Sequence, residues 1–412
     1  MRKNAVDKTL TPISGGVCAP KGFKASGWHC GISAYGTHAL SCGAMSKDIR
    51  EDLTLIFADK RCSVACVSSQ CATVGAPVLV SEKHAKFGYA RAVFCNSGIA
   101  NVLSSDGTTI AENICRIIAK KTGASKEEVL IASTGLIGET YPTQAVLDNL
   151  DGLINNLGDD NANSLAAARG MMSTDSFVKQ LSFSFFIGSY PCKIGAIFKG
   201  KTQVAPNMAT TLCFLTTDVN IAPQMLQKAL VSATNEGFNM LSLDGLASPN
   251  DFVCILANGT AGNYKVSCVD SEYKKFLAIL CDVIALVCKM IAADGGEKVL
   301  LCNLLGAKSK RTAYAVAKKI IEDSSLKVAL KQGTMELNTI YSALCKEIDQ
   351  KSVSEAEIFL RLDDNNDVLV AEDGKALPIS SALQEQILGA NTVELIIKLK
   401  DGNYGATAYG KI

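Results

Sequence analysis

Two segments of the sequence place hydroxyl-bearing side chains beside apolar runs. The first, Lys199–Asp218, is KGKTQVAPNMATTLCFLTTD, in which a polar loop leads through Ala209-Thr210 into an apolar strand. The second, Ile131–Gly138, is IASTGLIG, a strand that ends in a Ser-Thr-Gly turn. A threonine hydroxyl can act as a nucleophile once a base takes its proton. Because Thr is common in strands and Gly in turns, each segment alone is also typical of an ordinary strand-to-loop junction.

Other familiar catalytic arrangements find little support. The three histidines, His29, His38 and His84, all lie in the first quarter of the chain. The nucleophile-elbow pattern G-x-S-x-G does not occur, so a Ser-His-Asp arrangement is not expected. The sequence also has no P-loop and no well-placed G-x-G-x-x-G, which leaves a nucleotide cofactor without support.

The sixteen cysteines do not form a recognisable metal pattern, since no Cys-x-x-Cys pair occurs. Two groups lie close together in sequence, but neither has an established ligand spacing: His29, Cys30, His38 and Cys42, and then Cys62, Cys66 and Cys71. We therefore expect no metal site. We expect most of these cysteines to be reduced, small core residues.

Composition and charge indicate a soluble globular protein. The chain has 412 residues, of which 48% are hydrophobic and 20% charged, with a formal net charge of +1. Such a balance gives no basic field for nucleic acid or an anionic membrane. The N-terminus has no apolar stretch typical of a secretory signal, and the apolar run 276–293 contains Asp282 and Lys289. We expect a cytoplasmic protein in which that run is a buried core helix.

Short apolar runs alternate with amphipathic patterns, which favours an α/β protein with mixed sheets. We expect buried strands at 129–133, 211–215 and 252–256, and helices at 110–120, 225–231 and 313–321. Two hairpins are expected, at Asp363–Asp367 and at Asp401-Gly402.

A series of motifs in fixed order resembles the ornithine acetyltransferase (glutamate N-acetyltransferase) family of arginine biosynthesis, whose members are self-cleaving N-terminal-threonine enzymes. The matching blocks are GVCAPKGF at 16–23, APV at 76–78 with Ser81, RAV at 91–93, NSG at 96–98, AN at 100–101, STGLIG at 133–138, MSTD at 172–175, PNMAT at 206–210, DG at 244–245 with Ser248, ND at 250–251 and ANG at 257–259. The family's A-T-A-W-G is similar to ATAYG at 406–410.

The resemblance implies a mixed-sheet, ornithine-acetyltransferase-like α/β fold built from two autoproteolytic fragments. Cleavage between Ala209 and Thr210 would give an alpha fragment, residues 1–209, and a beta fragment, residues 210–412. Thr210 would then be the nucleophile. Its free α-amine, with a pKa near 8, would serve as the base that removes the hydroxyl proton.

The resemblance also assigns roles to other residues. The Thr134 hydroxyl and the Gly135 N–H match the family's oxyanion donors. Ser173, Lys199 and Glu297 match or stand beside the family's substrate-contacting positions. The implied reaction passes the acetyl group of N-acetylornithine to Thr210 and then to glutamate. It needs no cofactor, although acetyl-CoA would be an acetyl donor if the enzyme is bifunctional. The family's fragments assemble as an α2β2 heterotetramer.

Departures from the family pattern concentrate in the C-terminal third. Gly296 stands where the family has its substrate-contacting Glu, so Glu297 would have to replace it through a shift of register. The family's F-G-x-D-P-N-W-G-R loop is replaced by KQGTMELNT at 331–339, and its N-x-x-Y-x-T tail has no counterpart. Closer to the cleavage site, Lys201–Val204 replaces a small-residue stretch. Two alternatives therefore remain open: a related N-terminal-threonine acyltransferase or amidohydrolase with another substrate, and a non-catalytic relative.

Overall fold

The computed structural model describes residues 10–32, 50–201, 211–363 and 366–412. A nine-stranded sheet is assembled within this part of the chain, in the order β1-β6-β7-β8-β9-β3-β4-β5, with β2 paired to β3. Its strands are β1 Thr11–Pro12, β2 Phe23–Trp28, β3 Leu53–Ser68, β4 Tyr89–Asn96, β5 Val129–Ser133, β6 Lys179–Ile187, β7 Tyr190–Lys199, β8 Leu212–Thr217 and β9 Phe252–Ala257.

The long strand β3 divides this sheet into two layers. Its first half pairs with β2 and β4, its second half pairs with β9, and the register shifts between Phe57 and Cys62. Irregularities of this kind let one strand pass from one sheet to another. A shared apolar core joins the two layers face to face, with Ile56, Val93 and Leu130 on one side and Ile197, Phe214 and Phe252 on the other.

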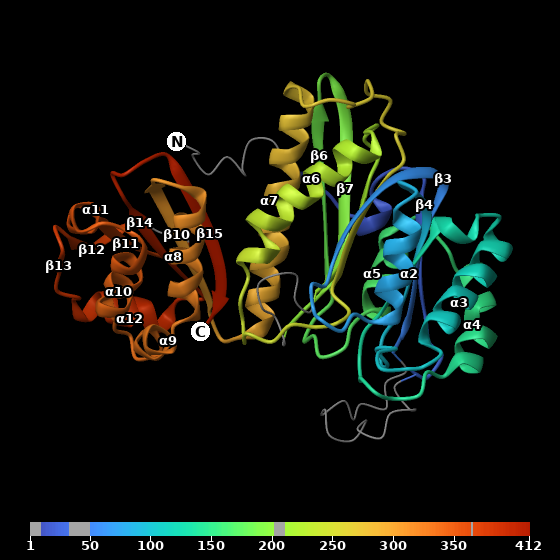
Figure 1. The fold of residues 1–412 in the computed structure, drawn as a ribbon, viewed down its shortest axis with the longest axis horizontal. Helices are drawn as coiled ribbons and strands as arrows, with labels where there is room; N and C mark the ends of the chain where they lie inside the picture. Colours follow the sequence, from blue (N-terminus) through green and yellow to red (C-terminus); the bar gives the residue numbers. More distant parts are fainter. Residues whose placement is uncertain (1–9, 33–49, 202–210, 364–365) are drawn as a thin grey trace.

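Helices cover the outer faces of both layers, as Figure 1 shows. On the β4–β5 side lie α2 Ala76–Ala85, α3 Gly107–Thr122 and α4 Thr143–Asn155, while α5 Asn161–Gly170 packs on β2. On the other side lie α6 Pro223–Glu236 and α7 Ser271–Gly295. Short 3-10 helices are η1 Gly16–Cys18, η3 Lys126–Glu128 and η4 Phe238–Met240.

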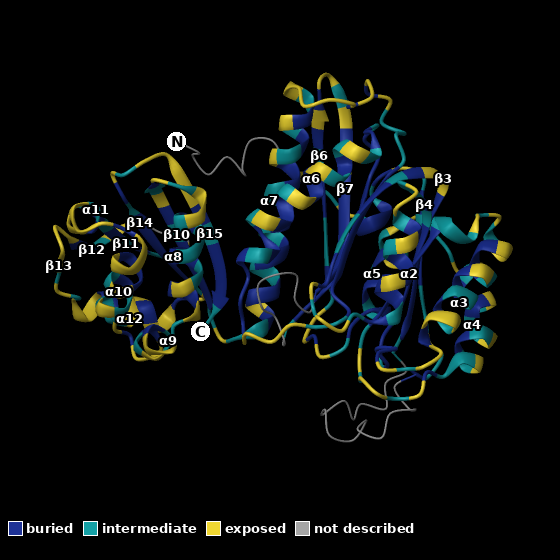
Figure 2. Cartoon of the chain, viewed as in Figure 1, coloured by how far each residue is buried: buried dark blue, intermediate teal, exposed yellow. Residues whose placement is uncertain are grey.

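Strand β9 illustrates why the buried strands of the first sheet are continuously apolar in sequence. All its residues are buried. Alternate side chains enter different cores: Val253, Ile255 and Ala257 contact the helix side, and Phe252, Cys254 and Leu256 lie between the sheets. A strand covered on both faces has no position for a polar side chain. Figure 2 shows this contrast: the strands are mostly buried, whereas the helices expose their outer faces.

A second sheet forms the C-terminal region, in the order β13-β12-β11-β14-β10-β15. Its strands are β10 Val299–Ala307, β11 Glu357–Leu362, β12 Val368–Glu372, β13 Lys375–Ala376, β14 Thr392–Lys398 and β15 Tyr404–Lys411. Helix α8 Lys310–Glu322 packs on β10 and β15. The remaining helices of this region are α9 Ser324–Lys331, α10 Leu337–Glu347, α11 Gln350–Ser354 and α12 Ser381–Gly389.

The predicted core helix is confirmed in α7. By length and composition alone it is the one helix of the described ranges that is long and apolar enough to cross a membrane. In the fold it packs against α6 and the first sheet on one side and contacts β15 and β10 of the C-terminal sheet as well. Its buried residues recur at helical spacing, for example Phe276, Leu280, Val283 and Val287. Contacts on both sides account for its unusual apolarity.

The prediction of an α/β protein with mixed sheets is confirmed, because β4–β5, β8–β9 and β10–β14 are parallel pairs among antiparallel ones. Each predicted strand and helix named above has its counterpart.

The predicted hairpin at Asp401-Gly402 is wrong. Strands β14 and β15 are not paired with each other, because β10 lies between them. The Asp401 and Gly402 N–H groups instead donate to the Gly306 carbonyl at the end of β10.

Candidate active site

The predicted site residues lie at ends of strands from both layers of the first sheet. Thr134 and Gly135 follow β5, and Lys199 is the last residue of β7. Ser173 belongs to the connection between α5 and β6. Because the two layers are packed face to face, these ends meet although the segments are far apart in sequence.

Lys199 lies at the centre of this group. Its ammonium donates to Thr134 Oγ1 at 2.8 Å and to Ser173 Oγ at 2.7 Å. The side chain is buried, with 4% of the residue exposed. Burial lowers the pKa of Lys199, and the carboxylate of Asp175 is the strongest of the charges that oppose this shift. Three residues predicted separately from the sequence are thus joined by hydrogen bonds.

Asp175 is the acidic counterpart of Lys199. Its Oδ1 accepts from the Gly200 N–H at 2.8 Å, and its Oδ2 accepts from the Ser173 N–H at 3.1 Å. Burial by itself raises the pKa of Asp175. The charges of Lys199 and Lys179 and the hydrogen bonds to the carboxylate outweigh burial and lower the pKa to about 2. The residue is therefore a carboxylate under all physiological conditions.

A second buried lysine extends the network away from the strand ends. Lys179, at the start of β6, donates to Asp175 Oδ1 at 2.7 Å and also to Asp294 Oδ2. All three side chains are at most 1% exposed. Asp294 lies in the last turn of α7 and accepts from the Ser176 N–H as well. A buried ion pair of this kind is tolerated when both charges are fully hydrogen-bonded.

The backbone at Gly135 has the geometry that an oxyanion donor needs. Its φ is +129°, and a Cβ there would lie 2.1 Å from the carbonyl carbon of Gly98, so only glycine fits. The neighbouring Thr134 N–H donates to the Asn96 carbonyl at 2.9 Å. Gly135 is exposed, and no acceptor for its N–H lies within the described residues. That N–H is free to bind a developing negative charge.

A small pocket opens between Thr134, Lys199 and Thr211, the residue that precedes β8. The Thr211 N–H donates to Asp251 Oδ1 at 2.7 Å, which fixes the start of this strand. Asn250 closes the pocket and ties the layers together by donating to the Ala100 and Ser133 carbonyls. The predicted cleavage pair, Ala209 and Thr210, lies outside the described residues.

Glu297 is not joined to this network. It is exposed, and its backbone N–H donates to the Ile412 carbonyl at 3.1 Å. Within the described ranges its carboxylate has no hydrogen bond or ion pair. Gly296 packs tightly against the same C-terminal residues, since a Cβ there would lie 2.8 Å from the Ile412 oxygen. The side chain predicted to replace the family's Glu is therefore separate from the Lys199 cluster.

Sequence reasoning assigned no role to Asp175, Lys179 or Asp294, although Asp175 and Asp294 belong to motifs that carry the resemblance. The spacing of Asp175 and Lys179, four residues apart, offered a weak signal. The contact of Lys179 with Asp294 joins residues 115 positions apart, and no signal in the sequence indicated it. No group of three potential metal ligands occurs among the residues that the structure describes. His38 and Cys42 lie outside them.

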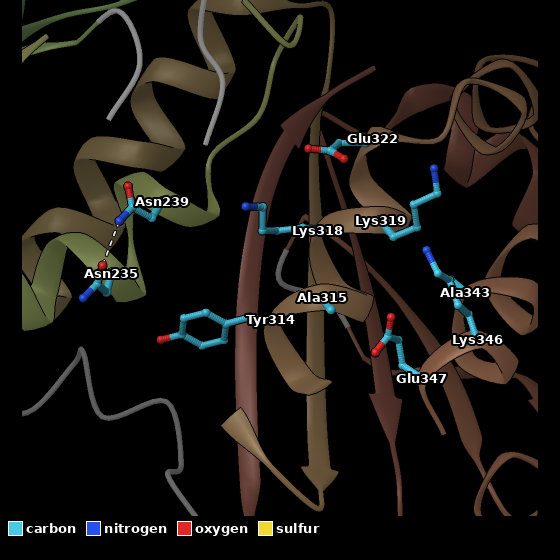
Figure 3. Close-up of a pocket in the computed structure, with 10 residues that line it drawn as sticks. All are labelled: Asn235, Asn239, Tyr314, Ala315, Lys318, Lys319, Glu322, Ala343, Lys346 and Glu347. Carbon is cyan, nitrogen blue, oxygen red and sulfur yellow. Dashed lines mark hydrogen bonds between the residues drawn. The ribbon is translucent and has the colours of Figure 1, made fainter. Parts of the chain in front are cut away.

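A larger cavity, of about 420 Å³, lies away from these residues, beside α8 and α10 and the end of α6 (Figure 3). Side chains of both charges line it, including the lysines Lys318 and Lys346 and the glutamates Glu322 and Glu347. Asn239 donates to Asn235 at its edge at 2.8 Å. None of the predicted site residues lines it.

Comparison with known proteins identifies relatives along almost the whole chain. Residues 37–411 match the ArgJ family. The chain is 29% identical over 401 residues to the arginine biosynthesis bifunctional protein ArgJ of Caldanaerobacter subterraneus subsp. tengcongensis, covering 97% of this chain and 95% of that protein. It is 30% identical over 410 residues to the glutamate N-acetyltransferase of Methanocaldococcus jannaschii, with 97% and 95% covered.

Among solved structures, the chain resembles an ornithine acetyltransferase complexed with ornithine from Mycobacterium tuberculosis. The TM-score is 0.38 at 27% identity, over 42% of this chain and 88% of that chain. The family match confirms the family predicted from the sequence. The chain belongs to the ArgJ family, a family of N-acetyltransferases that carry out acetyl transfer in arginine biosynthesis.

Proposed function

We propose that this protein transfers an acetyl group from N-acetylornithine to glutamate through an acetyl ester on Thr210, after self-cleavage between Ala209 and Thr210. The observation that carries the proposal is the Lys199 ammonium, which joins Thr134 and Ser173 by hydrogen bonds. Thr211, which follows Thr210 in sequence, lines the same pocket. The residue that follows the proposed nucleophile in sequence therefore lies beside the proposed oxyanion donor Thr134.

Self-cleavage would begin when the Thr210 hydroxyl attacks the Ala209 carbonyl, so that the peptide bond becomes an ester. Water then hydrolyses the ester, which releases the Ala209 carboxylate and a free Thr210 α-amine. Fragments 1–209 and 210–412 result. Since Lys199 and Thr134 belong to the first fragment and Thr210 to the second, the site would be built from both, held together by the pairing of β7 with β8.

Acetyl transfer would use the new α-amine as the base. The amine takes the Thr210 hydroxyl proton while the oxygen attacks the acetyl carbonyl of N-acetylornithine. When the C–N bond breaks, the same proton passes to the departing amine of ornithine. The amine of glutamate then attacks the acetyl ester, which releases N-acetylglutamate and restores the Thr210 hydroxyl.

Each tetrahedral intermediate carries an oxyanion, for which the Thr134 hydroxyl and the exposed Gly135 N–H are the proposed donors. An ammonium has three N–H donors, and Lys199 uses two of them on Thr134 and Ser173. The third is available to a substrate carboxylate. The exposed carboxylate of Glu297 is the proposed partner for a substrate amine. No step requires a cofactor, although acetyl-CoA would serve as a second acetyl donor in a bifunctional enzyme.

The proposal extends to assembly and location: an α2β2 heterotetramer of the two fragments, in the cytoplasm, acting on small amino-acid substrates. Size-exclusion chromatography with light scattering tests the assembly. A particle with the mass of one chain would contradict it.

Two measurements test the proposed reaction. Denaturing gel electrophoresis of the purified protein should give two fragments of similar size, and the Thr210→Ala variant should remain one band. Incubation of the cleaved protein with N-acetylornithine and labelled glutamate should produce labelled N-acetylglutamate. A fully cleaved sample that yields no labelled product would overturn the substrate assignment, whereas an uncleaved wild type would overturn the nucleophile.

A further inference from the structure

The proposed reaction makes no use of the Asp175 carboxylate, although it is the most highly bonded group of the cluster. It accepts from the backbone N–H of Ser173, from the backbone N–H of Gly200 and from the Lys179 ammonium. Ser173 supplies one of the hydroxyls that Lys199 contacts, and Gly200 directly follows Lys199. One carboxylate therefore holds both backbone segments that determine where the Lys199 side chain lies.

Asp175 is itself held rigidly from the opposite side. Lys179 bridges it to Asp294, and both contacts are excluded from solvent. A negative charge in the last turn of a helix is unfavourable toward the helix dipole, so Asp294 is compensated by the ion pair and by the Ser176 N–H. Asp294, Lys179 and Asp175 thus form a brace that runs from the end of α7 to Lys199.

The charge of Lys199 decides how the Thr134 hydroxyl is oriented. An ammonium donates hydrogen bonds and accepts none. Thr134 Oγ1 and Ser173 Oγ must therefore accept from Lys199, and their own protons point elsewhere. A neutral amine at the same position would accept as well as donate, and the Thr134 proton would then turn toward Lys199 for part of the time.

We propose that Asp175 is a positioning residue for the oxyanion donor Thr134, acting through Lys199. It fixes the ammonium by holding the backbone at Ser173 and Gly200, and it keeps the ammonium charged, so that the Thr134 proton is directed at the acetyl oxygen. The inference rests on the proposed function, in which Thr134 stabilises the oxyanion. It adds that Lys179 and Asp294, which hold Asp175 in the brace, contribute to the positioning of Thr134.

The pH dependence follows from the charges that face Lys199. These are Asp175 from the segment before β6, Cys95 on β4, Asp251 before β9 and Lys179 on β6. Burial lowers the pKa of Lys199, and Asp175 is the strongest opposing charge. Replacing Asp175 by Asn removes that opposition, so the Lys199 pKa falls further. The donor-only form of Lys199 is then lost at a lower pH than in the wild type.

A double-mutant cycle with Thr134→Val tests the inference on the cleaved protein. Asp175→Asn alone should lower kcat by about 10- to 100-fold and change KM by less than about 3-fold, because a misdirected donor costs less than a missing one. In the Thr134→Val background, which has no hydroxyl to direct, the same substitution should lower kcat by less than about 3-fold. Equal effects in both backgrounds would overturn the inference.

The pH profile of kcat separates positioning from general damage to the fold. The alkaline limb of Asp175→Asn should move to lower pH by about one unit. Asp218→Asn is the matched control, because this buried carboxylate accepts from the Lys193 N–H and lies outside the brace. Its alkaline limb should coincide with that of the wild type. An unshifted limb in Asp175→Asn would contradict the inference.

Two further measurements keep the test decisive. If Asp175→Asn does not fold or cleave, Asp294→Asn at the far end of the brace should show the same non-additivity with Thr134→Val at smaller amplitude. Independently of activity, the ¹³Cε resonance of Lys199 should titrate at lower pH in Asp175→Asn than in the wild type. An unchanged midpoint overturns the inference. A wild type that is cleaved but transfers no acetyl group overturns the proposed function and leaves the Lys199 titration to decide the positioning role.

Discussion

The two sides of the candidate site differ sharply in how firmly they are held. The hydroxyls of Thr134 and Ser173 accept hydrogen bonds from Lys199, the Asp175 carboxylate accepts from the backbone, and both charged side chains are buried. After α7, by contrast, Glu297 is exposed, and its only described hydrogen bond is made by its backbone to the Ile412 carbonyl.

This difference coincides with the pattern of matches to the family. The well-bonded side is built from segments that preserve the family motifs, whereas the exposed side is built from the segment in which Gly296 and Glu297 depart from them. Groups that stabilise developing charge must be fixed before the reaction, because reorganising them costs free energy. Groups that only select a substrate tolerate more variation. Under the proposed function, the first set of residues would therefore support the chemistry, and the second would determine the choice of amino acid.

The largest expected effect is that of Lys199→Met. The substitution removes both hydrogen bonds to Thr134 and Ser173 and the positive charge that does most to lower the pKa of Asp175, so kcat/KM should fall by about 10²- to 10³-fold. Lys193→Met, an exposed lysine on the same strand β7, is the control and should leave kcat/KM within about 2-fold of wild type. A fall of less than 10-fold in Lys199→Met would remove this lysine from the centre of the site.

Gly135→Ala should come next. A Cβ there would lie 2.1 Å from the Gly98 carbonyl carbon at a φ of +129°, so we expect the free energy of unfolding to drop by about 2–4 kcal/mol. Gly138→Ala, at a φ of +83° with no atom within 4 Å of the new Cβ, should cost only about 1–2 kcal/mol. Urea unfolding of both in the intact Thr210→Ala chain measures the difference, and equal costs would refute the close approach.

The stability of the Asp175 cluster should depend on pH in the acid range. The pKa of Asp175 is about 2 in the folded protein, below the ordinary value of about 3.8. Its contribution to stability is therefore complete above about pH 4 and is lost as the pH falls through about 2. We expect Asp175→Asn to lose about 2 kcal/mol more, relative to wild type, at pH 6 than at pH 2. A penalty independent of pH would show that the carboxylate's charge is not what stabilises the cluster.

The smallest expected effect is that of Glu297→Gln. An exposed carboxylate that is screened by water contributes little, so KM should rise by no more than about 3-fold with kcat unchanged. Steady-state kinetics with N-acetylornithine as the varied substrate measures this. A rise of about 30-fold or more would show that the Glu297 carboxylate contributes to substrate binding as strongly as a buried, fixed group, and would abolish the contrast between the two sides.

Much of the fold was predictable because its signals are local. Strand 129–133 and helix 110–120 follow from runs and periods that lie within single elements, and α7 follows from its apolar stripe. The two-layer arrangement was not predictable, since it depends on the register shift inside β3, a continuous strand in sequence. The hairpin at Asp401-Gly402 failed for a similar reason. A turn signal shows that the chain reverses, but not that β10 occupies the place between the two strands.

The candidate site was predictable only as a set of residue types. The motifs named Thr134, Ser173 and Lys199, and the structure joins these three. Their electrostatic support was not foreseen, because the contact of Lys179 with Asp294 is made between residues far apart in sequence. Burial of these charges also has no local signature, since isolated Asp and Lys residues are ordinarily exposed.

The most direct test of the central claim is the mass of the fragment that begins at Thr210 after brief incubation with N-acetylornithine in the absence of glutamate. Acetyl transfer through Thr210 predicts that residues 210–412 gain the mass of one acetyl group, that peptide mapping locates it on Thr210, and that added glutamate removes it. A cleaved protein that forms N-acetylglutamate without acetylation of Thr210 would contradict the claim.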